Sequence, residues 1–155
     1  MAGLTLRPGI DADLPRVRTF IAGVQARLGI QHDPGTADAD LVAPGFYAPP
    51  RGRLEVLEHA QDGIVGLIGT IELDANEAEL KKLYVASALR GTGCGAFLLE
   101  RSIAWARERG CRRMVLETNS ALERAMLLYT RRGFVVSTDT APRGQDCDRR
   151  LELAL

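Results

Sequence analysis

The chain turns sharply at Arg90-Gly91-Thr92-Gly93-Cys94-Gly95-Ala96, between a strand-like run at 79–85 and a helix-like run at 96–109. Three glycines within five residues let the backbone turn tightly, because glycine has no Cβ to clash. The helix that follows presents unpaired N–H groups and the positive end of its dipole. Arg90 adds a cation at the edge of the turn. This pattern predicts a binding site for phosphate oxygens at the helix N-terminus.

The segments around this turn alternate as in an α/β domain. The strands are expected at 4–7, 53–59, 64–73, 78–85, 112–118, 134–138 and 150–155, and the helices at 13–28, 96–109 and 121–131. Short turns between 53 and 85 predict an antiparallel meander, and the strand–helix–strand crossover over 78–118 predicts a parallel pair. Asp11 is the expected N-cap of the first helix. We therefore predict a mixed sheet in one α/β domain over residues 1–155.

Composition excludes several classes of protein. The chain has 20 basic and 20 acidic residues, which predicts no general attraction to nucleic acid or to an anionic membrane. The N-terminus lacks an apolar signal core and no apolar run approaches membrane-spanning length, so we expect a cytoplasmic protein. The three cysteines are odd in number and widely spaced, which favours reduced thiols. No metal site is predicted, because both histidines lie far from any cysteine.

Other phosphate-binding motifs fit the glycine-rich turn less well. A Walker motif is excluded, since no Gly-Lys-Ser/Thr follows the turn. The pattern Gly91-x-Gly93-x-x-Ala96 formally matches the dinucleotide fingerprint of a small Rossmann-like binder, and Glu117 lies where a ribose-binding acid is expected. However, residues 86–90 separate the strand from the first glycine, and only 38 residues follow Glu117. These two observations weigh against a dinucleotide site.

Four ordered segments resemble the GNAT superfamily of acetyl-CoA-dependent N-acetyltransferases. Arg90-x-x-Gly93-x-Gly95-Ala96 matches the Q/R-x-x-G-x-G/A signature, and residues 128–134, Leu-Tyr-Thr-Arg-Arg-Gly-Phe, match the segment LY-x-x-x-GF. Residues 83–85 and 116–119 resemble the family strands that flank the glycine-rich turn. The resemblance implies a mostly antiparallel sheet with a central splayed pair of parallel strands and helices on both faces. It covers roughly residues 79–136; the N-terminal part agrees only in the order of its elements.

This resemblance implies acetyl-CoA as the co-substrate, with its pantetheine arm between strands 79–85 and 114–119. The backbone groups of Leu83 and Val85 are expected to bond the pantetheine amides, while their side chains pack in the core. The N–H of Leu83 is expected to hold the oxyanion. The pyrophosphate is expected on the N–H groups of Gly91, Thr92, Gly93, Cys94, Gly95 and Ala96, with charge from Arg90. Asn119 is either a partner of the arm, a turn residue or the N-cap of the next helix.

The resemblance also implies direct attack of a primary amine in a ternary complex. Tyr129 is the candidate acid for the leaving thiolate, although it also completes an apolar helix face. Glu79 is the first choice for the base, Glu72 the second and Glu117 the third, and all three are common charged strand residues. The cysteines have no matched histidine, which argues against a thiol relay.

The acceptor is not specified by these motifs beyond a small-molecule or peptide amine. The loop 30–52 is expected to build its site, with Asp33, Asp38 and Asp40 as ammonium partners and Phe46-Tyr47 as walls, although loop acids are usually solvated. Lys81 and Lys82 are expected at a solvated position of the sheet. The resemblance also allows a homodimer. The rival within this fold is an acyl-CoA-binding sensor that has lost catalysis.

Overall fold

The computed structural model describes residues 3–30, 38–138, 142 and 147–155 of the chain. Three α-helices, seven strands and three short 3₁₀ turns make up this part of the chain. In order they are β1 (Leu4–Pro8), η1 (Asp11–Asp13), α1 (Leu14–Arg27), η2 (Ala39–Leu41), β2 (Gly52–His59), β3 (Gly63–Glu72), β4 (Glu77–Val85), η3 (Ser87–Leu89), α2 (Cys94–Glu108), β5 (Arg113–Thr118), α3 (Glu123–Arg132), β6 (Val135–Val136) and β7 (Arg149–Ala154).

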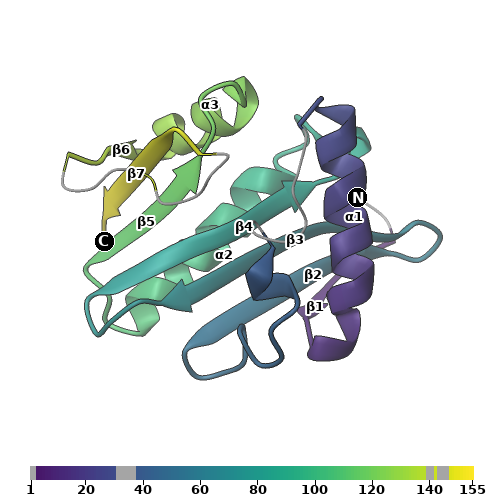
Figure 1. Cartoon of the computed structure of the whole chain (residues 1–155), viewed down its shortest axis with the longest axis horizontal. Helices are drawn as coiled ribbons and strands as arrows, with labels where there is room; N and C mark the ends of the chain where they lie inside the picture. Colours follow the sequence, from purple (N-terminus) through teal and green to yellow (C-terminus); the bar gives the residue numbers. More distant parts are fainter. Residues whose placement is uncertain (1–2, 31–37, 139–141, 143–146) are drawn as a thin grey trace.

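All seven strands belong to one sheet with the order β1-β2-β3-β4-β5-β7-β6. β4 and β5 run parallel, whereas the other neighbouring strands are antiparallel. Helix α2 makes the crossover between β4 and β5, as a parallel pair requires (Figure 1). The α/β class, the meander β2-β3-β4 and the mixed sheet are therefore confirmed.

Helices cover both faces of the sheet, and each face has its own core. On one face α1 and η2 lie over β2, β3 and β4, and Val17, Ile21 and Leu41 are fully buried there (Figure 1). On the other face α2 and α3 bury Leu98, Ile103 and the Tyr129 ring against the strands. The two faces are called the α1 face and the α2 face below. The side chains of β4 alternate between them, with Ala78 and Leu80 on the α2 face.

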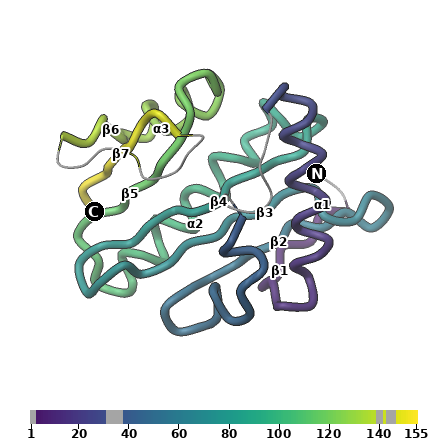
Figure 2. The backbone as a smooth tube through the Cα atoms, viewed as in Figure 1, coloured from purple at the N-terminus to yellow at the C-terminus, as the bar shows by residue number. Residues whose placement is uncertain are grey.

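Strands β4 and β5 separate halfway along their length. Their pairing ends at Leu80 and Leu116, yet β4 continues to Val85 beside β3. Lys81 is an extra residue at this point, because Leu80 opposes Thr70 while Lys82 opposes Gly69. Such a bulge bends a strand and increases its local twist. Figure 2 shows the two strands diverging beyond this point.

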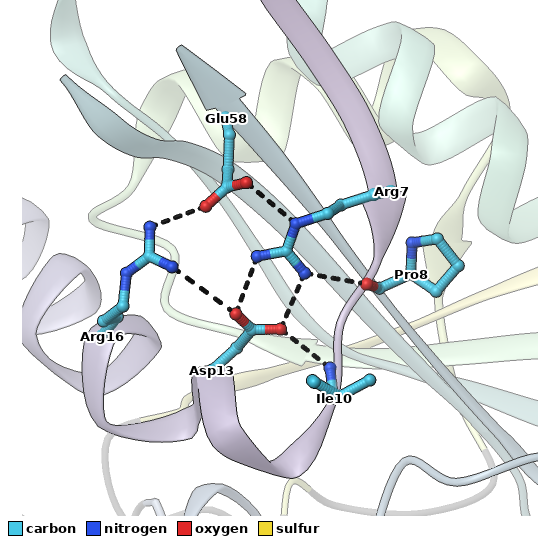
Figure 3. A network of polar contacts seen from close by, with 6 residues as sticks. All are labelled: Arg7, Pro8, Ile10, Asp13, Arg16 and Glu58. Carbon is cyan, nitrogen blue, oxygen red and sulfur yellow. Dashed lines mark hydrogen bonds and ion pairs between the residues drawn. The ribbon is translucent and has the colours of Figure 1, made fainter. Parts of the chain in front are cut away.

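Helix α1 is anchored to the sheet by a network of charged groups (Figure 3). The Arg7 guanidinium donates two hydrogen bonds to the Asp13 carboxylate, at 2.8 and 2.7 Å, and a third to Glu58 at 2.8 Å. Arg16 of α1 donates to Glu58 at 2.6 Å. Asp13 also accepts the Ile10 N–H at 2.9 Å. The network joins β1, β2 and the start of α1.

The prediction that Asp11 is the N-cap of α1 is wrong. Residues 11–13 form a 3₁₀ turn, so α1 begins later, at Leu14. The Asp11 carboxylate instead accepts the N–H of Gly45 from the following loop, at 3.1 Å. Asp13 has the capping-type contact because its carboxylate is held beside the helix start by Arg7.

Candidate active site

The glycine-rich turn closes directly onto the N-terminus of α2. Gly91 and Gly93 have φ values of 78° and 87°, a region in which a Cβ is strained, and Gly93 is the N-cap. The Thr92 N–H and hydroxyl both donate to the carbonyl of Leu89, at 3.3 and 2.6 Å. The first α2 residues thus present their N–H groups at the end of a 15-residue helix. The positive φ values require glycine at these two positions, and crowding does not, because a Cβ on either would meet no atom within 4 Å.

The other residues of the turn differ in their exposure. Cys94 is buried with Leu57 and Val65, so its side chain belongs to the core. Burial also raises the pKa of the Cys94 thiol. No ion pair links the half-buried Arg90 to another residue in the described part of the chain. At Cys94, therefore, the backbone N–H is the group that the turn presents.

A cavity of about 180 Å³ lies where β4 and β5 part. Its wall includes Leu83, Tyr84, Asn119 and Tyr129. The Ala86 N–H donates to Val65 of β3 at 2.8 Å, and backbone groups alternate along a strand. The N–H and C=O groups of Leu83 and Val85 therefore face the opposite edge, toward the gap. Their side chains pack against the core of the α2 face, as expected.

Tyr129 lies on α3, with its ring packed edge-on against Phe134 at 5.8 Å between centroids. It is 6% exposed and also lines the cavity. Burial raises the pKa of Tyr129 above that of a free phenol, with a further contribution from nearby Tyr84. A buried phenol of this kind stays protonated and can donate its proton.

Asn119 follows β5 and lines the same cavity. Its Oδ1 accepts the N–H of Ala121 at 2.9 Å, which makes it a turn residue. The N-cap alternative is wrong, because α3 begins at Glu123 and its N-cap is Leu122. The helix thus begins at Glu123, two residues after the predicted start at 121, and the chain turns at Asn119 before it.

The three candidate bases lie in different places. Glu79 is on the α1 face of β4, 3.7 Å from the Lys81 ammonium, outside the cavity wall. Glu72 pairs with Arg109 at 2.9 Å. Glu117 lines the cavity, and Arg150 lies 3.3 Å from its carboxylate. Of the three carboxylates, the fold brings Glu117 into the cavity wall with Tyr129.

Lys82, Asp38 and Asp40 form a buried polar cluster on the α1 face. Lys82 is 9% exposed, and its ammonium lies 3.5 Å from Asp38 and 3.2 Å from Asp40. The Tyr47 hydroxyl donates to Asp40. Burial raises the pKa of Tyr47, and Asp40 and Glu79 raise it further. The expectations of a solvated Lys82 and of solvated Asp38 and Asp40 are wrong, because η2 folds back over β4.

The Tyr47 ring fits over the bare backbone of β3. A Cβ at Gly69 would come within 2.7 Å of this ring. Phe46, the other expected wall residue, is partly exposed and packs edge-on against Tyr47 at 5.0 Å. Asp33 lies outside the described residues.

Gln25 and Tyr84 were missed by the sequence analysis, although both line the cavity. The Gln25 Nε2 donates to the Tyr84 hydroxyl at 3.2 Å, and burial raises the pKa of Tyr84 to about 12. The sequence did contain a signal that Gln25 is buried, because this polar residue lies four positions after Ile21 on the buried stripe of α1. Periodicity finds such a position but does not reveal what it faces.

Comparisons with known proteins show the family to which the chain belongs. The sequence model of the acetyltransferase (GNAT) family matches residues 30–134. The uncharacterized N-acetyltransferase Rv2669 of Mycobacterium tuberculosis is 32% identical over 124 residues, which cover 77% of this chain and 78% of that protein. The uncharacterized N-acetyltransferase YjgM of Escherichia coli is 33% identical over 128 residues, covering 79% and 76% respectively.

Solved structures share the whole fold. A GNAT-family acetyltransferase from Staphylococcus aureus aligns with a TM-score of 0.87 over 97% of this chain and 98% of its own, at 23% identity. An acetyltransferase from Streptococcus agalactiae aligns with a TM-score of 0.79 over 100% of both chains, also at 23% identity. The chain therefore belongs to the acetyltransferase (GNAT) family, and it is an N-acetyltransferase.

Proposed function

We propose that the protein transfers an acetyl group from acetyl-CoA to a primary amine. The separation of β4 from β5 after Leu80 and Leu116 carries this proposal. It leaves one edge of residues 81–85 without a neighbouring strand, and an extended amide-bearing arm can take that place. Leu83 and Val85 supply the backbone groups for the pantetheine amides, and Asn119 supplies a side chain just after β5.

The glycine-rich turn lies directly after this edge and suits the pyrophosphate. Its N–H groups from Gly91 to Ala96 stand at the positive end of α2, although that of Thr92 already donates to the Leu89 carbonyl, and Arg90 adds a full charge. Gly95 has only Leu128 and Val85 near its Cβ position, at 3.5 and 4.0 Å. A side chain there would stand beside the proposed path of the cofactor.

In the proposed reaction the amine nitrogen attacks the thioester carbon, and the carbon–sulfur bond breaks. The Leu83 N–H stabilises the oxyanion that forms. The Tyr129 hydroxyl donates its proton to the departing thiolate. The ammonium of the acceptor first loses a proton to a carboxylate. Glu79 is the base that the family resemblance puts first, and Glu117 is the alternative that lines the cavity.

A thermal-shift comparison of acetyl-CoA, CoA and NAD⁺ tests the donor. A ligand at 100 times its dissociation constant stabilises the native state by about 2.7 kcal/mol. We expect acetyl-CoA and CoA to raise the melting temperature and NAD⁺ to leave it unchanged. A shift with NAD⁺ alone contradicts the proposal and favours the dinucleotide alternative.

Release of the CoA thiol in the presence of amines tests the reaction. We expect thiol release that depends on both acetyl-CoA and the amine. Stabilisation by acetyl-CoA without thiol release from a broad amine panel would instead favour the acyl-CoA sensor. Glu79→Gln and Glu117→Gln separate the two base candidates, because the variant that lacks the true base should lose about 100-fold in turnover while the other keeps it.

A further inference from the structure

Gln25 lines the cavity and carries a buried side-chain amide. Gln25 is 6% exposed, and its Nε2 donates to the Tyr84 hydroxyl at 3.2 Å. Its Oε1 is buried and has no hydrogen-bond partner among the described residues. A buried carbonyl oxygen without a partner is costly and uncommon in folded proteins. Because Gln25 lines a cavity, a ligand bound there could supply the missing hydrogen-bond donor.

The charged residues beside Gln25 favour a cation over an anion. Asp38 and Lys82 line the same cavity, and Asp40 and Glu79 lie beside them on the α1 face. With Lys81, which lies 3.7 Å from Glu79, carboxylates outnumber ammonium groups by three to two among these five named side chains. The Lys82 ammonium already lies within 3.5 Å of two carboxylates, so it is poorly placed to attract a third.

We propose that Gln25 and Asp38 select the acceptor, and that the acceptor is a small cationic amine without a carboxylate next to its amino group. An N–H of the amine donates to Gln25 Oε1, and the Asp38–Lys82–Asp40 cluster supplies the negative potential. This inference rests on the proposed acetyl transfer. It assigns Gln25 a role in specificity, since the amide binds the acceptor and takes no part in bond breaking.

The orientation of the Gln25 amide decides what it recognises. The Tyr84 hydroxyl can donate as well as accept, so a reversed amide would direct Nε2 to the cavity and would select a hydrogen-bond acceptor. Gln25→Glu distinguishes these cases because a carboxylate only accepts. Gln25→Met keeps the length of the side chain and removes both polar ends.

The experiment compares L-alaninamide, a cation, with L-alanine, a zwitterion of nearly the same shape, by thiol release from acetyl-CoA. We expect kcat/KM to be at least about tenfold higher for alaninamide, equivalent to about 1.4 kcal/mol. Gln25→Met should raise the KM for alaninamide about tenfold while the KM for acetyl-CoA stays the same. Gln25→Glu should keep the KM for alaninamide within about threefold of the unmodified protein.

Gln61→Met is the matched control, because Gln61 lies exposed in the turn between β2 and β3. It should behave as the unmodified protein does. A purely structural Gln25 would lower the melting temperature of Gln25→Met and leave both KM values unchanged, which would overturn the inference. Equal use of alanine and alaninamide, or better activity in Gln25→Met than in Gln25→Glu, would also overturn it.

Failure of the acceptor inference can be distinguished from failure of the proposal that acetyl-CoA is the donor. If acetyl-CoA stabilises the protein but neither amine is acetylated, the acceptor inference is wrong while the donor site stands. If acetyl-CoA gives no stabilisation, the proposed function itself fails.

Discussion

Leu80 and Leu116 form the last residue pair that joins β4 to β5, and both side chains are buried in the core of the α2 face. The pair fixes the point from which the two strands separate. The bulge at Lys81 follows immediately, so the bend in β4 begins where the pairing stops. The cavity with Tyr129 and Asn119 opens beyond this pair.

Two glycines with the same backbone conformation offer a matched test of the phosphate site. Gly93 and Gly110 lie at opposite ends of α2, with φ values of 87° and 81°, and neither has an atom within 4 Å of its Cβ position. Alanine at either position should cost about 1 kcal/mol of unfolding free energy. Only Gly93→Ala should also weaken acetyl-CoA binding, by about tenfold or more, because it disturbs the N–H groups at the N-terminus of α2. Calorimetric titration of both variants measures the difference, and equal weakening would argue against the loop as the phosphate site.

Tyr129→Phe tests the proposed acid. The ring and its packing on Phe134 are kept, so the melting temperature and the Kd for acetyl-CoA should change little. Turnover should fall about 100-fold, a typical loss for a general acid. Steady-state kinetics with acetyl-CoA and an active amine checks this expectation. Unchanged turnover would leave Tyr129 with its packing role alone.

Gly69→Ala tests how closely Tyr47 is fitted to the sheet. The added methyl group would lie 2.7 Å from the ring, so we expect a loss of about 1–3 kcal/mol in unfolding free energy from overpacking. Gly23→Ala is the control, since this α1 glycine has no atom within 4 Å of its Cβ position. It should raise stability by about 0.5–1 kcal/mol. Urea denaturation gives both values, and a neutral Gly69→Ala would mean that Tyr47 can move aside at no cost.

Asp13 should make stability depend on pH in the acid range. Hydrogen bonds from Arg7 hold the pKa of the Asp13 carboxyl below its ordinary value of 3.8. Because the folded pKa is lower than the unfolded one, the stabilisation is present above about pH 4 and is lost as pH falls through the folded pKa. Asp13→Asn should therefore cost about 2 kcal/mol at pH 7 and less at pH 3.

Urea midpoints at both pH values measure this effect. Glu108→Gln, at an exposed position near the end of α2, is the control that should change little. A constant difference between Asp13→Asn and the unmodified protein across this pH range would contradict the assignment to the Asp13 carboxylate.

Local rules explain most of what could be predicted from the sequence. The glycine-rich turn, a helix directly after it (predicted from 96 and found from Cys94) and the parallel crossover to β5 depend on backbone freedom and on connection handedness, which are properties of short segments. The family motifs lie in the same segments. Local rules misplaced the N-cap of α1, predicted at Asp11 and found at Asp13, and left the role of Asn119 open, which the structure makes a turn residue before the N-cap Leu122.

The sequence by itself thus determined the order of the elements, the family and the glycine-rich turn, since each depends on residues close together in the chain. The tertiary structure alone decided that Lys82 is buried between Asp38 and Asp40, that Glu117 lines the cavity while Glu79 does not, and that Gln25 reaches Tyr84. These outcomes depend on which distant segments pack together and on the bulge that redirects β4. The burial and charge of a side chain's surroundings come from those distant contacts, so its own neighbours in sequence do not reveal them.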